Sequence, residues 1–274
     1  MKRAIRATFF ILFIIALFYT VPVFLNNTLW TKVPVNIAVE DIVVKLCILV
    51  LPCLAYIYIY RSVINIKECF KFNNISLIQI VILVLIGFLI QPFAMLISSI
   101  TSILFENKVI DYMNAYEGIP FWLTLVSMAV MPALMEEAMM RGIVLYESRD
   151  LGIKIAAILN GILFGIIHRN FSQFFYAFVF GIIFVYIVKI TNSLYSTMII
   201  HFIINATQVV IMKIFTTQKI IISSEITNIS LLQKISGIGF IAIICIICLP
   251  IISYLFKKLV YISENKKRLN NQIV

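Results

Sequence analysis

Charged side chains are scarce in this sequence. Only 12% of its 274 residues are Asp, Glu, Lys or Arg, whereas 62% are hydrophobic and the mean hydropathy is +1.07. Soluble globular domains carry about 25% charged residues. The composition therefore excludes a soluble enzyme and predicts a helical protein that crosses a membrane several times.

Several common site signatures are also missing. The sequence has neither the HExxH motif of zinc peptidases nor the GxSxG motif of serine hydrolases. Its five cysteines predict no disulfide framework. Cys245 and Cys248 have a CxxC spacing, but they lie in an apolar run without a His or acidic neighbour, which favours packing over zinc or redox chemistry. No basic face with interleaved aromatic residues indicates nucleic-acid binding.

Apolar runs long enough to cross a bilayer recur along the chain. A crossing helix needs about 17 to 25 residues, and the sequence contains about eight such runs, so we expect an all-α transmembrane bundle that forms one integral membrane domain over residues 1–274. The runs lie near Ile5–Leu25, Ile42–Tyr60, Leu77–Ile100, Phe121–Leu145, Gly152–His168, Gln173–Ile190, Leu194–Phe215 and Gly237–Phe256.

Lysine and arginine are distributed unevenly between the two ends of these runs. They concentrate before the first run and after the last one, at Lys2, Arg3, Arg6, Lys257, Lys258, Lys266, Lys267 and Arg268. Because such residues gather on the cytoplasmic side, both termini are predicted to be cytoplasmic in a multi-pass protein of the cell membrane. The formal net charge of +10 favours membrane lipid as a partner over nucleic acid.

The stretch MEEAMMRG, from Met135 to Gly142, places three charges inside an apolar run. At 100° per residue, Glu137 and Arg141 lie about 40° apart on a helix, whereas Glu136 lies about 140° from Arg141. This spacing predicts a Glu137–Arg141 pair and leaves Glu136 available for another task. The alternative is that all three form a buried structural ion-pair cluster. Pro132 is expected to kink or loosen the helix nearby.

The protein has only two histidines, and both fall in or at the end of apolar runs. His168 follows Gly161 and Gly165 at i, i+4, i+7 spacing, which predicts a face where a neighbouring helix approaches closely. His201 and Asn205 share a face at i, i+4 spacing. Each alone could be a packing residue, but together with Glu136 they predict a polar site inside the membrane.

Two kinds of hydrolytic chemistry fit these residues. A carboxylate beside an imidazole can remove a proton from water, while a His and an Asn donate hydrogen bonds to the oxyanion of a tetrahedral intermediate. Alternatively, Glu136, His168 and His201 could bind a divalent metal such as zinc, which lowers the pKa of its bound water to about 7. The absence of a compact HExxH spacing favours the reaction that requires no cofactor.

The motifs EExxxR (Glu136, Glu137, Arg141), FxxxH (Phe164, His168) and HxxxN (His201, Asn205) resemble, in this order, those of the CPBP intramembrane proteases. That family includes type II CAAX prenyl endopeptidases and bacterial proteins labelled abortive infection or bacteriocin-processing, and its members are often called metalloproteases. The resemblance implies a catalytic core at residues 121–215 in which Glu136 and His168 activate water and His201 and Asn205 form the oxyanion site. It makes Glu137, Arg141 and Phe164 supporting residues.

The resemblance implies cleavage of a membrane-associated or lipidated protein or peptide. The abundance of Ile, Asn and Lys hints at an AT-rich bacterial genome. A non-catalytic immunity or transporter-accessory protein, in which the polar groups only join helices, is the alternative. The limits of the apolar runs place His168 about 20 Å in depth from Glu136 and His201, at roughly 1.5 Å per residue. A shared site is thus expected to require tilted or broken helices.

Overall fold

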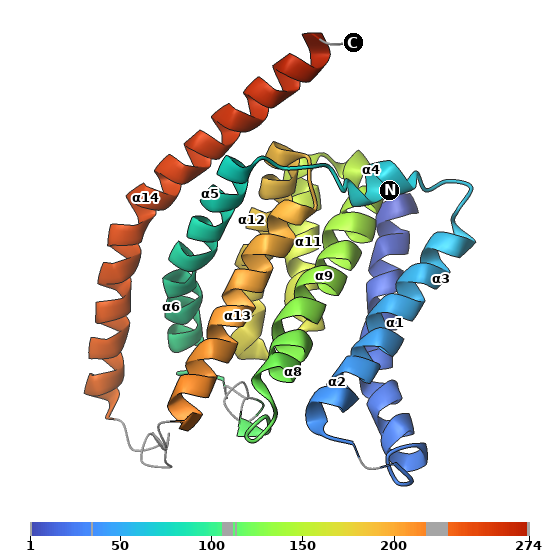
Figure 1. Ribbon diagram of the computed structural model, residues 1–274, viewed down its shortest axis with the longest axis vertical. Coiled ribbons are helices and arrows are strands. Elements are labelled where there is room, and N and C mark those ends of the chain that lie inside the picture. Colours follow the sequence, from blue (N-terminus) through green and yellow to red (C-terminus); the bar gives the residue numbers. More distant parts are fainter. Residues whose placement is uncertain (1, 34, 106–111, 113, 218–229, 273–274) are drawn as a thin grey trace.

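The computed structural model describes residues 2–33, 35–105, 112, 114–217 and 230–272, and this part of the chain contains helices and no strand. Figure 1 shows how these helices are arranged. Their bounds are α1 (Lys2–Thr28), α2 (Ile37–Lys45), η1 (Leu46–Val50), α3 (Leu51–Ile59), α4 (Ile66–Phe70), α5 (Leu77–Leu89), α6 (Gln91–Thr101), α8 (Phe121–Leu125), η2 (Val126–Val130), α9 (Met131–Glu137), η3 (Ala138–Val144), α10 (Leu145–Glu147), η4 (Arg149–Leu151), α11 (Ile153–Ile167), α12 (Phe171–Thr191), α13 (Tyr195–Thr217) and α14 (Leu231–Gln272).

The expected all-α membrane bundle is confirmed. Among the described residues, seven helical stretches are long and apolar enough to cross a bilayer, and α11, with 15 residues, provides a shorter eighth apolar helix. Large apolar side chains such as Phe9, Phe24 and Phe240 are mostly exposed on the outer helices. Such surfaces suit lipid rather than water, and the protein is a multi-pass membrane protein.

The helices lie side by side, with α14 at one edge of the bundle and α1, α2 and α3 at the other (Figure 1). The stretch from α8 to α10 lies between these edges, together with α11, α12 and α13. The first turn of α1 and the last turns of α14 lie toward the same end of the bundle, as an even number of crossings requires. The cytoplasmic location of that end remains a prediction from the distribution of Lys and Arg.

The distortion expected near Pro132 is present as a π-helical turn. The N–H of Met131 donates to the carbonyl of Val126, five residues earlier, and the N–H of Leu51 does the same to Leu46. In both cases the next residue is a proline, which has no N–H to continue the α-helical pattern. A third π-helical segment, η3, begins directly after Glu137. The charged stretch therefore lies on irregular helix.

The glycine face predicted on α11 is confirmed, and its partner is α12. A Cβ added to Gly161 would lie 2.7 Å from the carbonyl oxygen of Phe178, and one added to Gly165 would lie 2.7 Å from the ring of Phe174. On the facing helix, a Cβ added to Gly181 would lie 2.5 Å from the Cα of Gly161. The backbones are in direct contact, which fixes α11 and the histidine that follows it.

The last helix is longer than the apolar run near Gly237–Phe256 indicated. It continues to Gln272 because the polar residues beyond Phe256 include good helix formers and no Gly or Pro. Near that end, the side chain of Gln79 on α5 donates a 3.0 Å hydrogen bond to the hydroxyl of Ser263, and Lys266 donates to the carbonyl of Asn74. These contacts hold the polar part of α14 against α5.

We expect Gly181→Ala to destabilise the protein, because the new methyl group would overlap the backbone of Gly161 and force α11 and α12 apart. Overpacking of this kind costs about 1 to 3 kcal/mol. Gly239→Ala is the matched control, since a Cβ there meets nothing within 4 Å. Thermal unfolding of the purified proteins in detergent measures the difference. Equal unfolding temperatures for the two variants would contradict the close approach.

Candidate active site

The predicted Glu137–Arg141 pair is present in the centre of the bundle. Arg141 Nη1 donates to Glu137 Oε1 at 2.9 Å, and both side chains are completely buried. The pair joins the end of α9 to the middle of η3. Because an isolated charge is costly inside a membrane, each of these two residues depends on the other.

Two aromatic rings flank the same guanidinium. Its central carbon lies 4.2 Å from the centroid of the Phe164 ring on α11 and 4.9 Å from that of Phe184 on α12. Cation–π attraction of this kind is strongest where water is excluded. Arg141 thus connects three helical stretches through one carboxylate and two rings.

His201 is the second group bound to Glu137. Its Nδ1 lies 2.9 Å from Glu137 Oε1, the oxygen that also accepts from Arg141. A carboxylate paired with arginine accepts hydrogen bonds and donates none, so Nδ1 of His201 carries a proton. The ring is held in one orientation, with Nε2 on the side away from Glu137.

His168 is oriented by its own helix. Its Nδ1 lies 2.7 Å from the backbone carbonyl oxygen of Phe164, which can only accept, so this nitrogen also carries a proton. In the neutral ring, Nε2 then has a free lone pair. That is the form required of a general base or of an acceptor for a water proton.

The Phe164 ring brings the two histidines together. Its centroid lies 4.8 Å from that of His168 and 5.9 Å from that of His201, and both pairs are edge-to-face with interplanar angles of 86°. The expected 20 Å difference in depth is therefore wrong. Because α11 has only 15 residues, its far end lies within the bundle, and Phe164 reaches from there to α13.

Glu136 is half-buried, and its Oε2 is buried without a hydrogen-bond partner among the described residues. The carboxyl group is close enough to His168 and Arg141 to interact electrostatically with both. Glu136 is thus a carboxylate near His168 that forms no ion pair with any described residue, as the helix spacing predicts.

Asn205 is half-buried on α13, one turn after His201. The i, i+4 spacing places both residues on one helix face. No contact of the Asn205 side chain joins it to Glu136 or His168 in the described structure, so its part in the site stays a prediction from helix geometry.

Two residues of the site environment were not predicted from the sequence. Asn160 on α11 is fully buried and donates a 2.7 Å hydrogen bond to the carbonyl of Met140, inside the π-helical segment η3. Its only sequence signal is an amide within an apolar run. Phe184 carries no signal, because one phenylalanine among many does not reveal which ring lies against a buried cation.

Within the described residues, no group of three or more His, Cys, Asp and Glu side chains is placed to hold a metal ion. The Nδ1 atoms of both histidines are engaged with oxygen acceptors, and Glu137 is bound to Arg141 and His201. A histidine that binds a metal through Nε2 commonly donates its Nδ1–H to a carboxylate or a carbonyl oxygen, so these contacts suit a metal-bound ring as well as a metal-free one, and a reaction without metal stays a prediction.

The fold and site define a helical membrane protein with a carboxylate, two oriented imidazoles and a buried ion pair at its centre. Comparison with family models agrees: the segment of residues 118–207 matches the family described as type II CAAX prenyl endopeptidase Rce1-like. It contains every residue of the predicted site. Searches of curated proteins and of solved structures gave no match.

We expect Arg141→Met to lower stability far more than Glu136→Gln. The first change leaves the carboxylate of Glu137 buried without its counter-charge, at a cost of about 3 to 5 kcal/mol. The second removes a charge that no cation neutralises directly. Unfolding temperature and abundance in membranes are the measurements.

The double variant Glu137→Gln/Arg141→Met separates lost charge balance from lost packing. It is expected to recover part of the stability, because neither charge is then left alone. Equal stability of Arg141→Met and Glu136→Gln would contradict the division of roles between the two glutamates.

Proposed function

We propose that the protein is an intramembrane endopeptidase that hydrolyses peptide bonds of membrane-associated or lipidated proteins or peptides. The observation that carries this proposal is a carboxylate outside any ion pair, Glu136, near an imidazole, His168, whose Nε2 is free to accept a proton. The Rce1-like domain over residues 118–207 supports the same reaction class.

Glu136 and His168 are the groups suited to activate water. In the proposed step, Nε2 of His168 accepts a hydrogen bond that orients the water, and Glu136 takes its proton as the hydroxide attacks the scissile carbonyl carbon. Glu136 then returns the proton to the departing amine, so the products are a carboxylic acid and an amine, which ionise to a carboxylate and an ammonium group. General acid–base catalysis of this kind contributes about 10² to 10⁴ in rate.

His201 and Asn205 are the proposed donors to the oxyanion. The Asn205 amide can donate directly. Because Nδ1 of His201 already carries a proton toward Glu137, Nε2 is the ring nitrogen left to face the substrate, and it donates only as part of a doubly protonated ring. Glu137 and Arg141 thereby act as positioning residues for His201 rather than as groups that touch substrate.

The reaction is proposed to need no metal ion. The support is the absence of a compact HExxH spacing, together with the position of Glu136 near His168, because a carboxylate and an imidazole can generate the nucleophile by general-base catalysis alone.

The central prediction concerns Glu136→Gln. The amide keeps the shape of the side chain but cannot accept the water proton, so we expect cleavage to fall by about 10² to 10⁴. The measurement compares peptides released from membranes that contain either form of the protein, with mass spectrometry of the new termini.

Glu117→Gln is the control, because it makes the same chemical change at an exposed carboxyl group outside the site. It should release the same peptides as the unmodified protein. If Glu136→Gln accumulates normally and retains full biological function, the polar groups act only in helix association, and the non-catalytic alternative is correct.

Metal removal tests the other part of the proposal. We expect purified protein treated with a tight chelator to keep its cleavage activity, and elemental analysis to find no stoichiometric zinc. Loss of activity that added zinc restores would move Glu136, His168 and His201 from proton transfer to coordination. The reaction class would remain hydrolysis in that case.

A further inference from the structure

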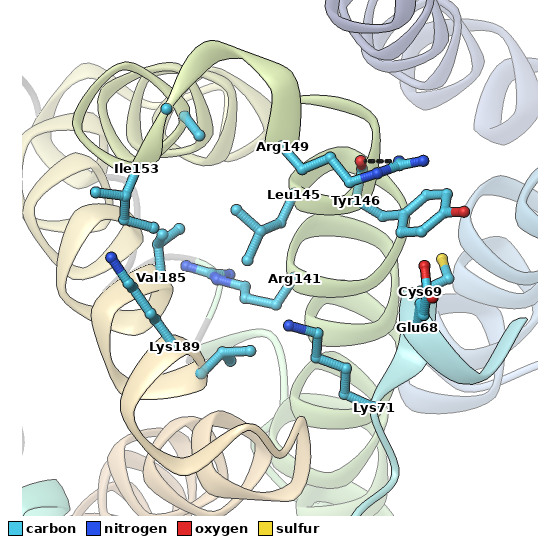
Figure 2. A pocket seen from close by; sticks show the side chains of 13 residues that line it. Glu68, Cys69, Lys71, Arg141, Leu145, Tyr146, Arg149, Ile153, Val185 and Lys189 are labelled. Carbon is cyan, nitrogen blue, oxygen red and sulfur yellow. Dashed lines mark hydrogen bonds between the residues drawn. The ribbon is translucent and has the colours of Figure 1, made fainter. Parts of the chain in front are cut away.

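A second polar feature lies toward one end of the bundle, where α4, α10, α11 and α12 meet (Figure 2). It is a pocket of about 380 Å³, and none of Glu136, His168, His201 and Asn205 lines it. The lining residues are Glu68, Cys69, Lys71, Arg141, Leu145, Tyr146, Arg149, Gly152, Ile153, Ala156, Val185, Val188 and Lys189.

The pocket is strongly basic. Four cationic side chains line it, namely Lys71, Arg141, Arg149 and Lys189, against the single acid Glu68. In the described part of the chain neither Lys71 nor Lys189 forms an ion pair. Arg149 packs against Tyr146 instead: its guanidinium carbon lies 3.6 Å from the centroid of the Tyr146 ring. Figure 2 shows these two side chains close together. Lys71 and Lys189 are thus the cations at the pocket without an ion pair, and Arg141 lies buried in its wall.

Arg141 contributes an unused hydrogen-bonding edge. Its Nη1 binds Glu137, and Phe164 and Phe184 flank the guanidinium, but its Nε and Nη2 are buried and have no hydrogen-bond partner among the described residues. These two nitrogens form one edge of the guanidinium, and their parallel N–H groups match two oxygens of one anion. A buried donor pair without an acceptor is costly, which indicates a ligand.

The position of Lys71 beside the pocket is also energetically unfavourable, in two ways. Burial lowers its pKa, and repulsion from Lys267 on α14 lowers it further, while only Glu68 acts in the opposite direction. The residue also lies at φ 44°, a left-handed conformation that is unfavourable for a lysine, and its carbonyl accepts from the N–H of Leu194. The backbone thus holds this ammonium group beside the pocket despite both costs.

We propose that the pocket binds the phosphate group of an anionic phospholipid. Lys189 lies two residues before the end of α12, Lys71 directly follows α4, and Arg149 lies two residues after the spanning stretch Phe121–Glu147. This is the depth at which headgroups meet a spanning helix. The rest of the wall is largely apolar, with Leu145, Ile153, Ala156, Val185 and Val188. Cations beside an apolar wall fit a phosphate attached to a glycerol backbone better than a free, fully hydrated ion.

The test uses purified protein in detergent, titrated with short-chain phosphatidylglycerol or with phosphatidylcholine of the same chain length. Equilibrium binding and the unfolding temperature are both recorded, because a ligand that binds only the folded state raises that temperature. We expect clear preference for phosphatidylglycerol. Each lysine near a lipid phosphate contributes about fivefold in affinity, so Lys71→Gln/Lys189→Gln should bind about 25-fold more weakly.

Three variants make this result specific. Glu68→Gln removes the one opposing charge and should bind more tightly, whereas Lys71→Arg/Lys189→Arg should retain binding. Lys67→Gln/Lys154→Gln removes two exposed charges from residues next to the same pocket without changing its lining, and should bind as the unmodified protein does. A loss in this control equal to that in Lys71→Gln/Lys189→Gln would reduce the effect to general surface charge and overturn the proposal.

Two further outcomes would overturn the choice of ligand. Inorganic phosphate that binds as tightly as phosphatidylglycerol would show that the apolar wall contributes nothing. A soluble peptide that displaces the lipid through its free terminal carboxylate, but not as the amide, would assign the pocket to a peptide end. All readouts are binding and unfolding, so the result does not depend on whether the protein is a protease.

Discussion

The centre of this protein depends on one buried cation. A guanidinium cannot be placed inside a membrane without compensation, and Arg141 receives it from Glu137 and from the rings of Phe164 and Phe184. Phe164 belongs to an apolar cluster with α1 and η3, and Phe184 to another with α5 and α14. The cation therefore lies where two packed halves of the bundle meet, and the residues that neutralise it also determine how those halves fit together.

The same ion pair accounts for the orientation of the site. Glu137 fixes His201 through Nδ1, whereas the carbonyl of Phe164 fixes His168 through Nδ1. The two rings have the same protonated nitrogen, but they face different partners. A buried carboxylate holds one ring and a backbone carbonyl of its own helix holds the other, so the two imidazoles are oriented independently. This difference is the basis on which the proposed reaction assigns them different tasks.

The sequence predicted those features that depend on neighbours within one helix. The Glu137–Arg141 pair and the glycine face of α11 follow from i, i+4 spacing, and the spans follow from apolar length. Contacts between different helices could not be predicted in this way. Nothing in the pattern indicates that Phe184 lies against Arg141 or that Asn160 binds Met140. The depth of His168 was misjudged because the short α11 was assumed to cross as its longer neighbours do. The polar last turns of α14 were not predicted, because hydropathy marks only the apolar part of a helix.

Arg141 also connects the candidate active site to the basic pocket. One nitrogen of its guanidinium is bound to Glu137, while Nε and Nη2 are left without acceptors in a residue that lines the pocket. An anion bound to that second edge would share the positive charge with Glu137. Because Glu137 also holds His201, only one carboxylate separates the cation that would bind such an anion from the candidate active site, and the two sites share the single buried guanidinium of Arg141.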